Sequence, residues 1–304
     1  MESPKDLLNL LKIVRLHIVL GGVLAFTLGL FLGLVDGGSF NFISAPLFYA
    51  IVFFGDLSTH FSNDYFDVDQ DKYEGKYKFF SGRRILVKHP SLLPYARRIA
   101  IVLFSISILI AAIVIIFGLA PVELLFIVVA ANSLGWFYSA PPLRLVSRGL
   151  GEVAIALAVG FAIPAMGYLS VRGHLDGLFW LFVLPFVLYG FVLALSLEVP
   201  DMEVDRKSDR KNFGVHRDEH AVFLLVLVGA SGAFLWMIFG GWLLNDAQIV
   251  FWATPFAAVP LAAAIAGFLG VREKKRIGVF CAVNILSLFA FNVLMVAYLA
   301  LIVL

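Results

Sequence analysis

The sequence predicts an all-α membrane protein, a bundle of nine transmembrane helices that forms a single domain over residues 1–304. Its composition is the first observation: 61% of the residues are hydrophobic and only 14% are charged, with a mean hydropathy of +0.96. Soluble domains are about 45–50% apolar and about 25% charged, so this composition excludes an ordinary soluble protein. The second observation is that apolar runs of roughly 20 residues, enough to cross a bilayer, recur along the whole chain.

Nine apolar runs are candidate spans, of which the fourth is the shortest. The first run follows a charged N-terminal stretch without a small-residue cleavage site, so we interpret it as a retained helix rather than a signal peptide. The single cysteine, Cys281, lies in an apolar run, which excludes an intramolecular disulfide and a cysteine-rich metal site. The runs cover residues 13–34, 42–62, 96–118, 121–138, 152–171, 177–199, 220–243, 248–270 and 277–303.

The basic residues orient this bundle. With nine spans, the N-terminus and the connections after spans two, four, six and eight share one side, and 22 of the 23 Lys and Arg residues fall there. Only Arg172 falls on the other side. Because basic residues gather in cytoplasmic loops, we expect a multi-pass protein of the cell membrane with its N-terminus in the cytoplasm and its C-terminus outside. The main cytoplasmic connections would be residues 63–95, 139–151 and 200–219.

Two acidic stretches follow spans two and six and would cap the cytoplasmic end of the bundle. They are Asn63–Asp71 and Asp201–Asp209. Their position after even-numbered spans suggests two repeated four-helix halves plus a ninth helix. If both stretches are helical, each places three oxygen-bearing side chains on one helix face. These trios, at i, i+4 and i+8, are Asn63, Asp67 and Asp71, and Asp201, Asp205 and Asp209.

Carboxylates at the edge of a membrane need compensation. An ionisable residue inside a bilayer costs about 2.5–3.5 kcal/mol on insertion scales, so these carboxyl groups predict a wet or metal-filled pocket. Mg²⁺ prefers oxygen ligands and is commonly held by one or two carboxylates together with substrate phosphates. Two Mg²⁺ ions between the trios would leave room for a diphosphate, with nearby Lys and Arg balancing its charge. A lipid diphosphate would place its head in this cage and its tail between the helices.

Span two carries a further polar stripe above its acidic motif. Asp56, His60 and Asp64 lie at i, i+4 and i+8. Ionisable residues within a span usually face a cavity. We interpret His60 as a packing histidine rather than a ligand, and Asp56 as either a cavity-lining residue or a partner in a buried hydrogen bond.

The two motifs resemble the Asp-rich signatures of the UbiA family of intramembrane prenyltransferases. The first reads Asn63-Asp64-x-x-Asp67-x-x-x-Asp71 and the second Asp201-x-x-x-Asp205-x-x-x-Asp209. The Tyr-Ser-x-Pro-Pro segment at 138–142 and Ser81-Gly82-Arg83 are also similar to that family. The resemblance implies Mg²⁺-dependent transfer of a polyprenyl group from a prenyl diphosphate, through an allylic carbocation, to a lipophilic or aromatic acceptor. The expected partners are these substrates and the lipid bilayer, and not nucleic acid.

The resemblance also implies roles for individual residues. The segment Lys72–Lys76 lacks the Arg-Pro pair that many members show there, which leaves the sub-family and the acceptor open. The implied ligands of Mg²⁺ are Asn63, Asp67, Asp71, Asp201, Asp205 and Asp209. The implied catalytic residues are Asp64, Asp67, Asp201 and Asp205. Residues implied to grip the diphosphate or cap the chamber are Arg15, Lys72, Arg83, Tyr138, Arg144 and Lys211.

Several functions compete on these residues. The Tyr-Ser-x-Pro-Pro segment and Arg148–Glu152 favour an aromatic acceptor of quinone synthesis, and a glycerol-phosphate hydroxyl in ether-lipid synthesis is the alternative. A CDP-alcohol phosphotransferase would need an Asp-Gly and Ala-Arg signature that this sequence lacks. A divalent-cation transporter would need ionisable residues that continue to the outer face, and the outer halves of these spans carry almost none.

Overall fold

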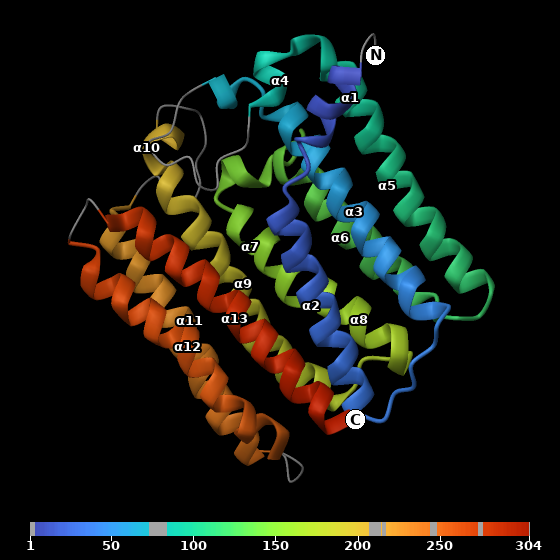
Figure 1. Ribbon diagram of the computed structural model, residues 1–304, viewed down its shortest axis with the longest axis vertical. Coiled ribbons are helices and arrows are strands. Elements are labelled where there is room, and N and C mark those ends of the chain that lie inside the picture. Colours follow the sequence, from blue (N-terminus) through green and yellow to red (C-terminus); the bar gives the residue numbers. More distant parts are fainter. Residues whose placement is uncertain are drawn as a thin grey trace.

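The computed structural model describes residues 4–72, 84–206, 214, 217–243, 248–272 and 276–303. Every regular element within these ranges is a helix, and no strand occurs in them (Figure 1). The prediction of an all-α protein is confirmed. Residues Arg83, Asp209 and Lys211, to which the sequence assigned roles, lie outside the described part of the chain.

Long helices form the body of the bundle. From Gly151 to Arg172 the chain forms one continuous helix, called here the α7–α8 rod, in which α7 continues through the π-helical turn η4 into α8. The long elements are α2 (Leu16–Val35), α3 (Ser44–Phe66), α5 (Leu93–Ile116), α6 (Glu123–Ser139), α7 (Gly151–Leu157), η4 (Ala158–Ala162), α8 (Ile163–Arg172), α9 (Gly177–Glu198), α11 (Glu219–Leu243), α12 (Gln248–Gly270) and α13 (Ile277–Val303).

Seven helical segments in the described ranges are long and apolar enough to cross a membrane. They comprise α2, α5, the α7–α8 rod, α9, α11, α12 and α13. The helix α6 is apolar but has only 17 residues. The helix α3 has 23 residues but carries Asp56, His60, Asn63 and Asp64, which lower its hydropathy. The count of nine spans, the two repeated halves and the orientation in the membrane therefore stay predictions.

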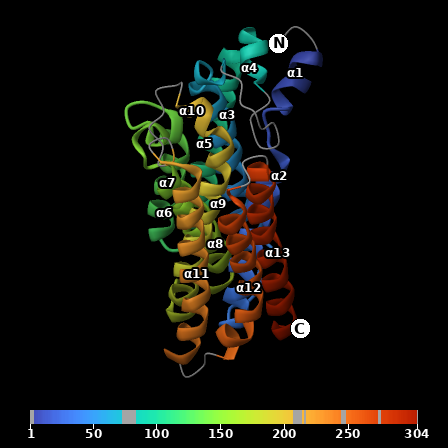
Figure 2. The same ribbon diagram turned by 90° about the vertical axis from the view of Figure 1, so that its left-hand side faces the viewer.

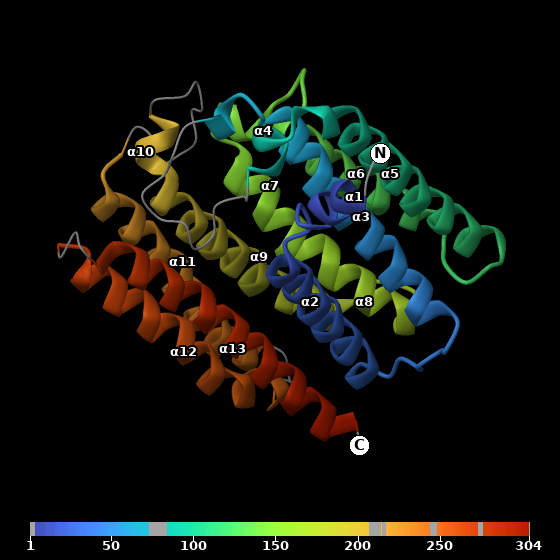
Figure 3. The same ribbon diagram turned by 45° about the horizontal axis from the view of Figure 1, so that its top comes forward.

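Short helical elements gather at one end of the bundle. Figures 1 and 3 show α1, α4 and α10 at this end, and Figures 1 and 2 show α13 finishing at the opposite end. The same end holds the last turn of α3 and the last turn of α9. The short elements are α1 (Pro4–Leu11), η1 (Gln70–Lys72), α4 (Ile85–Lys88), η2 (Pro90–Leu92), η3 (Leu145–Arg148), η5 (Val199–Asp201) and α10 (Met202–Asp205).

The helix α2 packs closely against α8 at two glycines. A Cβ atom on Gly29 would overlap the carbonyl oxygen of Pro164, and one on Gly167 would overlap that of Phe26. Next to this crossing, Leu32 and Tyr168 are fully buried in the core that α2 and α8 share with α9, α11, α12 and α13. The glycines let the two backbones approach, which is how helices pack where lipid gives no hydrophobic driving force.

Both acidic motifs begin where a long helix ends. The helix α3 ends at Phe66, and Asp67 already lies outside it with φ −95° and ψ 6°. The first motif is therefore not one continuous helix, which was the condition under which the sequence placed its trio on one face. The spacing nevertheless survives, because the backbone N–H of Asp67 donates to the Asn63 carbonyl and that of Asp71 donates to the Asp67 carbonyl, each at 2.8 Å. In the second motif the backbone passes from η5 into α10, which ends at Asp205.

Candidate active site

A cavity of about 870 Å³ opens between α2, α3, α6, the α7–α8 rod, α9 and α13. Acidic and amide side chains line the end that holds both motifs: Asn63, Asp64, Asp67, Asp71 and Asp205. Aliphatic and aromatic side chains line the part between the helices, including Leu28, Val52, Ile163, Phe186 and Phe291. The cavity therefore combines a polar end with an apolar chamber, as an amphiphilic substrate requires.

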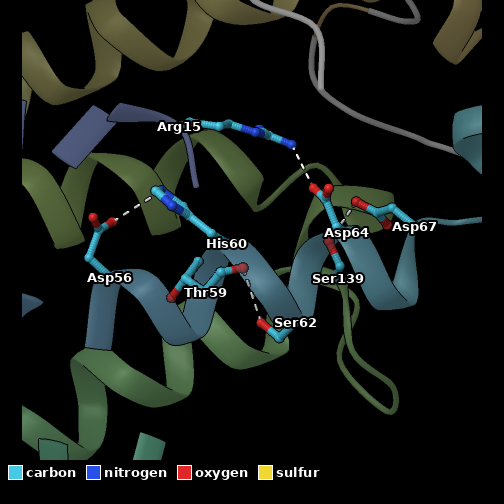
Figure 4. A network of polar contacts seen from close by, with 8 residues as sticks. All are labelled: Arg15, Asp56, Thr59, His60, Ser62, Asp64, Asp67 and Ser139. Atoms are coloured by element: carbon cyan, nitrogen blue, oxygen red, sulfur yellow. Dashed lines mark hydrogen bonds and ion pairs between the residues drawn. The ribbon is translucent and has the colours of Figure 1, made fainter. Parts of the chain in front are cut away.

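The first motif contributes its side chains from the last turn of α3 and the turn that follows. Asp64 is 4% exposed and Asp67 is 8% exposed, so both carboxyl groups are withdrawn from water. Arg15, the residue before α2, donates from Nη2 to Asp64 Oδ1 at 2.9 Å. Ser139, the last residue of α6, donates from Oγ to Asp67 Oδ2 at 2.8 Å. Figure 4 shows both contacts.

The second motif reaches the same cavity through Asp205. This residue ends α10, is 4% exposed and lines the polar end together with the first motif. The backbone of Asp201 lies in η5, at the start of the same turn. The structure thus brings Asp205 to the first motif, although Asp71 and Asp205 lie 134 residues apart in the sequence.

The residues proposed to grip the diphosphate do not all reach the cavity. Arg15 and Tyr138 line it. Lys72 does not, and its Nζ donates to Asp69 Oδ1 at 2.6 Å in a pair exposed to water. Arg144 also lies outside the lining and donates a hydrogen bond of 3.3 Å to the side-chain amide of Gln70, once that amide is turned to satisfy both its polar atoms.

Four charged residues that the sequence analysis did not select also line the cavity. Arg84 and Lys88 come from the start and the end of α4, and Glu152 and Glu198 come from α7 and α9. The backbone N–H of Gly214 donates to Glu198 Oε1 at 2.7 Å, which ties the segment after the second motif to α9. The sequence could have predicted the two glutamates as cavity residues, because a carboxyl group inside an apolar run usually faces a cavity. Nothing in the sequence distinguishes Arg84 and Lys88 from the other basic residues of the connection between α3 and α5.

The donor atoms at the polar end fit a hard cation in kind. They are carboxylate and amide oxygens, the ligands that Mg²⁺ takes. Within the described part of the chain, the buried Oδ1 atom of Asn63 has no hydrogen-bond partner, so it is an acceptor that a cation or water would satisfy. Among the residues the structure describes, no three His, Cys, Asp or Glu side chains converge on one point.

A family model confirms the resemblance seen in the sequence. The model of the UbiA prenyltransferase family matches residues 23–288, from the second turn of α2 to the middle of α13. The chain belongs to the UbiA prenyltransferase family. It is therefore a prenyltransferase, and not the cation transporter that the sequence left as an alternative. A search of curated proteins found no match.

Solved structures of UbiA proteins share the fold over nearly the whole chain. A UbiA homolog from Archaeoglobus fulgidus bound to DMAPP and Mg²⁺ aligns with a TM-score of 0.69 and 17% identity, covering 97% of this chain and 99% of the homolog. The apo structure of a UbiA homolog from Aeropyrum pernix K1 gives 0.70 and 16%, covering 95% and 98%. A digeranylgeranylglyceryl phosphate synthase gives 0.65 and 14%, covering 98% and 99%. At these identities the likeness shows the fold.

Proposed function

We propose that this UbiA protein transfers a polyprenyl group from a prenyl diphosphate to an aromatic quinone precursor, in a reaction that depends on Mg²⁺. The observation that carries the proposal is the single cavity that joins an acidic end to an apolar chamber inside the bundle. A prenyl diphosphate matches this division, because its anionic head requires cations and its hydrocarbon tail requires an apolar environment. A homolog with DMAPP and Mg²⁺ bound has the same fold.

The polar end would bind the head of the donor. Asn63, Asp67, Asp71 and Asp205 line it, and with Asp201 and Asp209 they complete the proposed set that holds two Mg²⁺ ions. When bound, Mg²⁺ neutralises charge on the diphosphate and makes it a better leaving group. Arg15 and Arg84 line the same end and add fixed positive charge for the leaving group. Asp64 acts indirectly, since it holds Arg15 at 2.9 Å.

The apolar chamber would shield the reacting carbon. Tyr189, Phe289 and Phe291 line it, and the rings of Tyr189 and Phe291 lie 4.7 Å apart between centroids. Aromatic faces attract cations, so these rings stabilise positive charge on an allylic group. Excluding water from the chamber prevents hydrolysis of the reactive group before the acceptor attacks it.

A second acceptor, the hydroxyl of a glycerol phosphate, is favoured by one feature of the cavity. Lys88 lines the cavity in addition to Arg15 and Arg84, the two cations assigned above to the diphosphate. Lys88 would bind the phosphate of such an acceptor. A digeranylgeranylglyceryl phosphate synthase is among the proteins with this fold. An aromatic carboxylate would use Lys88 as well, so we keep the aromatic acceptor as the first proposal.

A product assay with purified protein distinguishes these acceptors. The protein is incubated with Mg²⁺, geranylgeranyl diphosphate and a panel of hydroxybenzoate, dihydroxynaphthoate, homogentisate and geranylgeranylglyceryl phosphate, and products are identified by mass spectrometry. We expect one prenylated aromatic product, which Asp67→Ala and EDTA each abolish. A prenylated glycerol phosphate would replace the first proposal by the second. If no acceptor is prenylated and Mg²⁺ does not promote donor binding, the proposed function is wrong.

A further inference from the structure

His60 on α3 is a buried histidine without a hydrogen-bond partner. Its side chain is 5% exposed, it lines the cavity, and neither Nδ1 nor Nε2 has a hydrogen-bond partner in the part of the chain that the structure describes. The nearest charged atom is Asp56 Oδ1, one turn earlier on α3, at 3.6 Å from Nε2. Asp56 also lines the cavity. In Figure 4 the two side chains lie next to each other on the side of α3 that faces Arg15.

This arrangement differs from that of the two neighbouring buried serines on the same helix. Ser58 Oγ donates to the Ala100 carbonyl at 2.9 Å, and Ser62 Oγ donates to the Thr59 carbonyl at 3.2 Å. Both hydroxyl groups are thereby satisfied. Leaving a buried imidazole unsatisfied costs free energy, so a purely structural histidine is expected to have a partner. The ring of His60 instead keeps hydrogen-bonding capacity at the wall of a cavity large enough for a substrate.

His60 lies between the acidic end and the apolar chamber of the cavity. His60 lies one turn before Asp64, about 6 Å along the helix from it, on the side of the motif that leads into the apolar chamber. The diphosphate would lie at Asp67 and Asp205, so the carbon bonded to it, and the acceptor that attacks this carbon, lie between the acidic end and the chamber. His60 borders this region.

Resting on the proposed function, we propose that His60 is the proton acceptor of the transfer reaction and that Asp56 orients it. The bond between the first prenyl carbon and the diphosphate oxygen breaks, and its electron pair leaves with the diphosphate. A nucleophilic oxygen or ring carbon of the acceptor gives an electron pair to the prenyl carbon. The proton that this acceptor atom carried passes to the imidazole, which later releases it to water.

The two ring nitrogens have different roles in this proposal. The 3.6 Å between Nε2 and Asp56 Oδ1 is too long for a hydrogen bond. In this proposal a small shift on substrate binding brings Nε2–H to Asp56 Oδ1, so that Nδ1 carries the lone pair that takes the proton and the Asp56 carboxylate stabilises the resulting imidazolium. The other charged or titratable groups around the ring are Asp64, one turn along α3, and Arg15 and His17 from the start of α2. Arg15 is engaged with Asp64. Asp56 is thus the carboxylate available to pair with the ring.

Chemical rescue tests this assignment. The rate of product formation with the accepted acceptor is measured for wild type, His60→Ala, His60→Gln, Asp56→Asn and the control Ser62→Ala, whose hydroxyl does not line the cavity. Mg²⁺-dependent binding of the prenyl diphosphate is measured on the same samples. We expect both His60 variants to lose about 10²–10⁴-fold in kcat, the range of general-base catalysis, with donor binding unchanged. Asp56→Asn loses less, and Ser62→Ala keeps the wild-type rate.

Adding imidazole distinguishes a role of His60 as a base from a purely structural role. Imidazole is expected to restore turnover to His60→Ala, which has space for it, and not to His60→Gln, whose side chain fills that space. Wild-type rates in His60→Gln would overturn the assignment, and so would a loss of donor binding in both variants without rescue. A wild-type protein that prenylates no acceptor overturns the proposed function as well, whereas an active wild type with an unaffected His60→Gln overturns the assignment of His60 alone.

Discussion

Ser139 Oγ donates a hydrogen bond of 2.8 Å to Oδ2 of Asp67, and this bond joins two segments that lie 72 residues apart in the sequence. Ser139 is the last residue of α6 and 1% exposed, and Asp67 is the first residue after α3. The Tyr-Ser-x-Pro-Pro segment therefore contacts the first acidic motif directly. Ser139 therefore helps to hold the Asp67 carboxylate in one orientation at the polar end of the cavity.

Replacing Ser139 by alanine is expected to weaken Mg²⁺ binding without preventing folding. Loss of a residue that orients a metal ligand typically lowers metal affinity about 10- to 100-fold. We expect the Mg²⁺ concentration for half-maximal product formation to rise by this factor in Ser139→Ala, with kcat at saturating Mg²⁺ changing less. A titration of product formation with Mg²⁺ measures it.

The matched control for this change is Ser170→Ala. Ser170 is also buried, but its Oγ donates to the Gly167 carbonyl at 2.6 Å and not to a residue of an acidic motif. Its Mg²⁺ dependence should equal that of the wild type. An unchanged Mg²⁺ titration in Ser139→Ala would contradict the role of Asp67 as a ligand oriented by this bond.

The pair of Arg15 and Asp64 is expected to stabilise the fold as well as the site. Asp64 has a side chain that is 5% exposed, so Arg15→Gln would leave a buried carboxylate without its cation. We expect a loss of about 1–3 kcal/mol in the free energy of unfolding. The double variant Arg15→Gln with Asp64→Asn should recover part of this loss, because no unpaired charge remains. Unfolding of the detergent-solubilised protein measures both.

The exposed pair of Lys72 and Asp69 provides the comparison. Both side chains are largely in water, 62% and 80% exposed, so Lys72→Gln should change the free energy of unfolding by less than about 0.5 kcal/mol. Equal losses in Lys72→Gln and Arg15→Gln, or no recovery in the double variant, would show that the Arg15 contact is not a stabilising pair.

Hydropathy and spacing sufficed to predict the helical membrane fold and the acidic end of the cavity. Both depend on local patterns: long apolar runs must be helical in lipid, and oxygen-bearing residues four apart share a side. Although α3 ends at Phe66, Asn63, Asp67 and Asp71 keep a helix-like spacing, because the backbone N–H groups of Asp67 and Asp71 each donate to the carbonyl four residues earlier. The polar residues of α3 also explain why composition alone does not count it as a span.

Contacts between distant segments could not be predicted from those patterns. Lys72 is adjacent to the first motif in sequence, but it pairs with Asp69 and does not line the cavity. Arg84 and Lys88 lie farther along, yet α4 returns them to the cavity. Which basic residue of a connection faces the site depends on the path of its backbone, which hydropathy does not encode. His60, interpreted from the sequence as a packing histidine, has no hydrogen-bond partner among the residues that the structure describes, which hydropathy could not indicate.

Gly29 is expected to tolerate no side chain, because the Pro164 carbonyl occupies the position that a Cβ atom on residue 29 would take. Gly29→Ala should destabilise the contact between α2 and α8 by about 1–3 kcal/mol or more. Gly22→Ala, two turns earlier on α2, is the control, because nothing lies within 4 Å of its added Cβ. Alanine favours helix more than glycine does, so this control should gain about 0.5–1 kcal/mol. Thermal unfolding in detergent compares them, and similar losses in both variants would contradict close packing at Gly29.

Asp36 lies at the end of the bundle opposite the site, and its ionisation is expected to make the stability of the protein depend on pH. It lies just after α2, where its carboxyl contacts the Tyr168 hydroxyl, and Tyr168 also contacts Asp176. Burial raises the pKa of Asp36, and a hydrogen bond with the Asp176 carboxyl raises it further. Arg172 donates to Asp176 at 3.0 Å and helps that carboxyl keep its charge. In the folded protein Asp36 therefore retains a proton that the unfolded chain would release.

The sign of the pH effect follows from this raised pKa. A group with a raised folded pKa contributes stability that is fully present below its unfolded pKa and lost as the pH rises through the folded value. Asp36→Asn keeps a hydrogen-bond donor toward Asp176 at every pH. We expect its melting temperature to match the wild type near about pH 4 and to exceed it increasingly toward about pH 8. A constant difference between the two proteins over this range would show that Asp36 is not the titrating group.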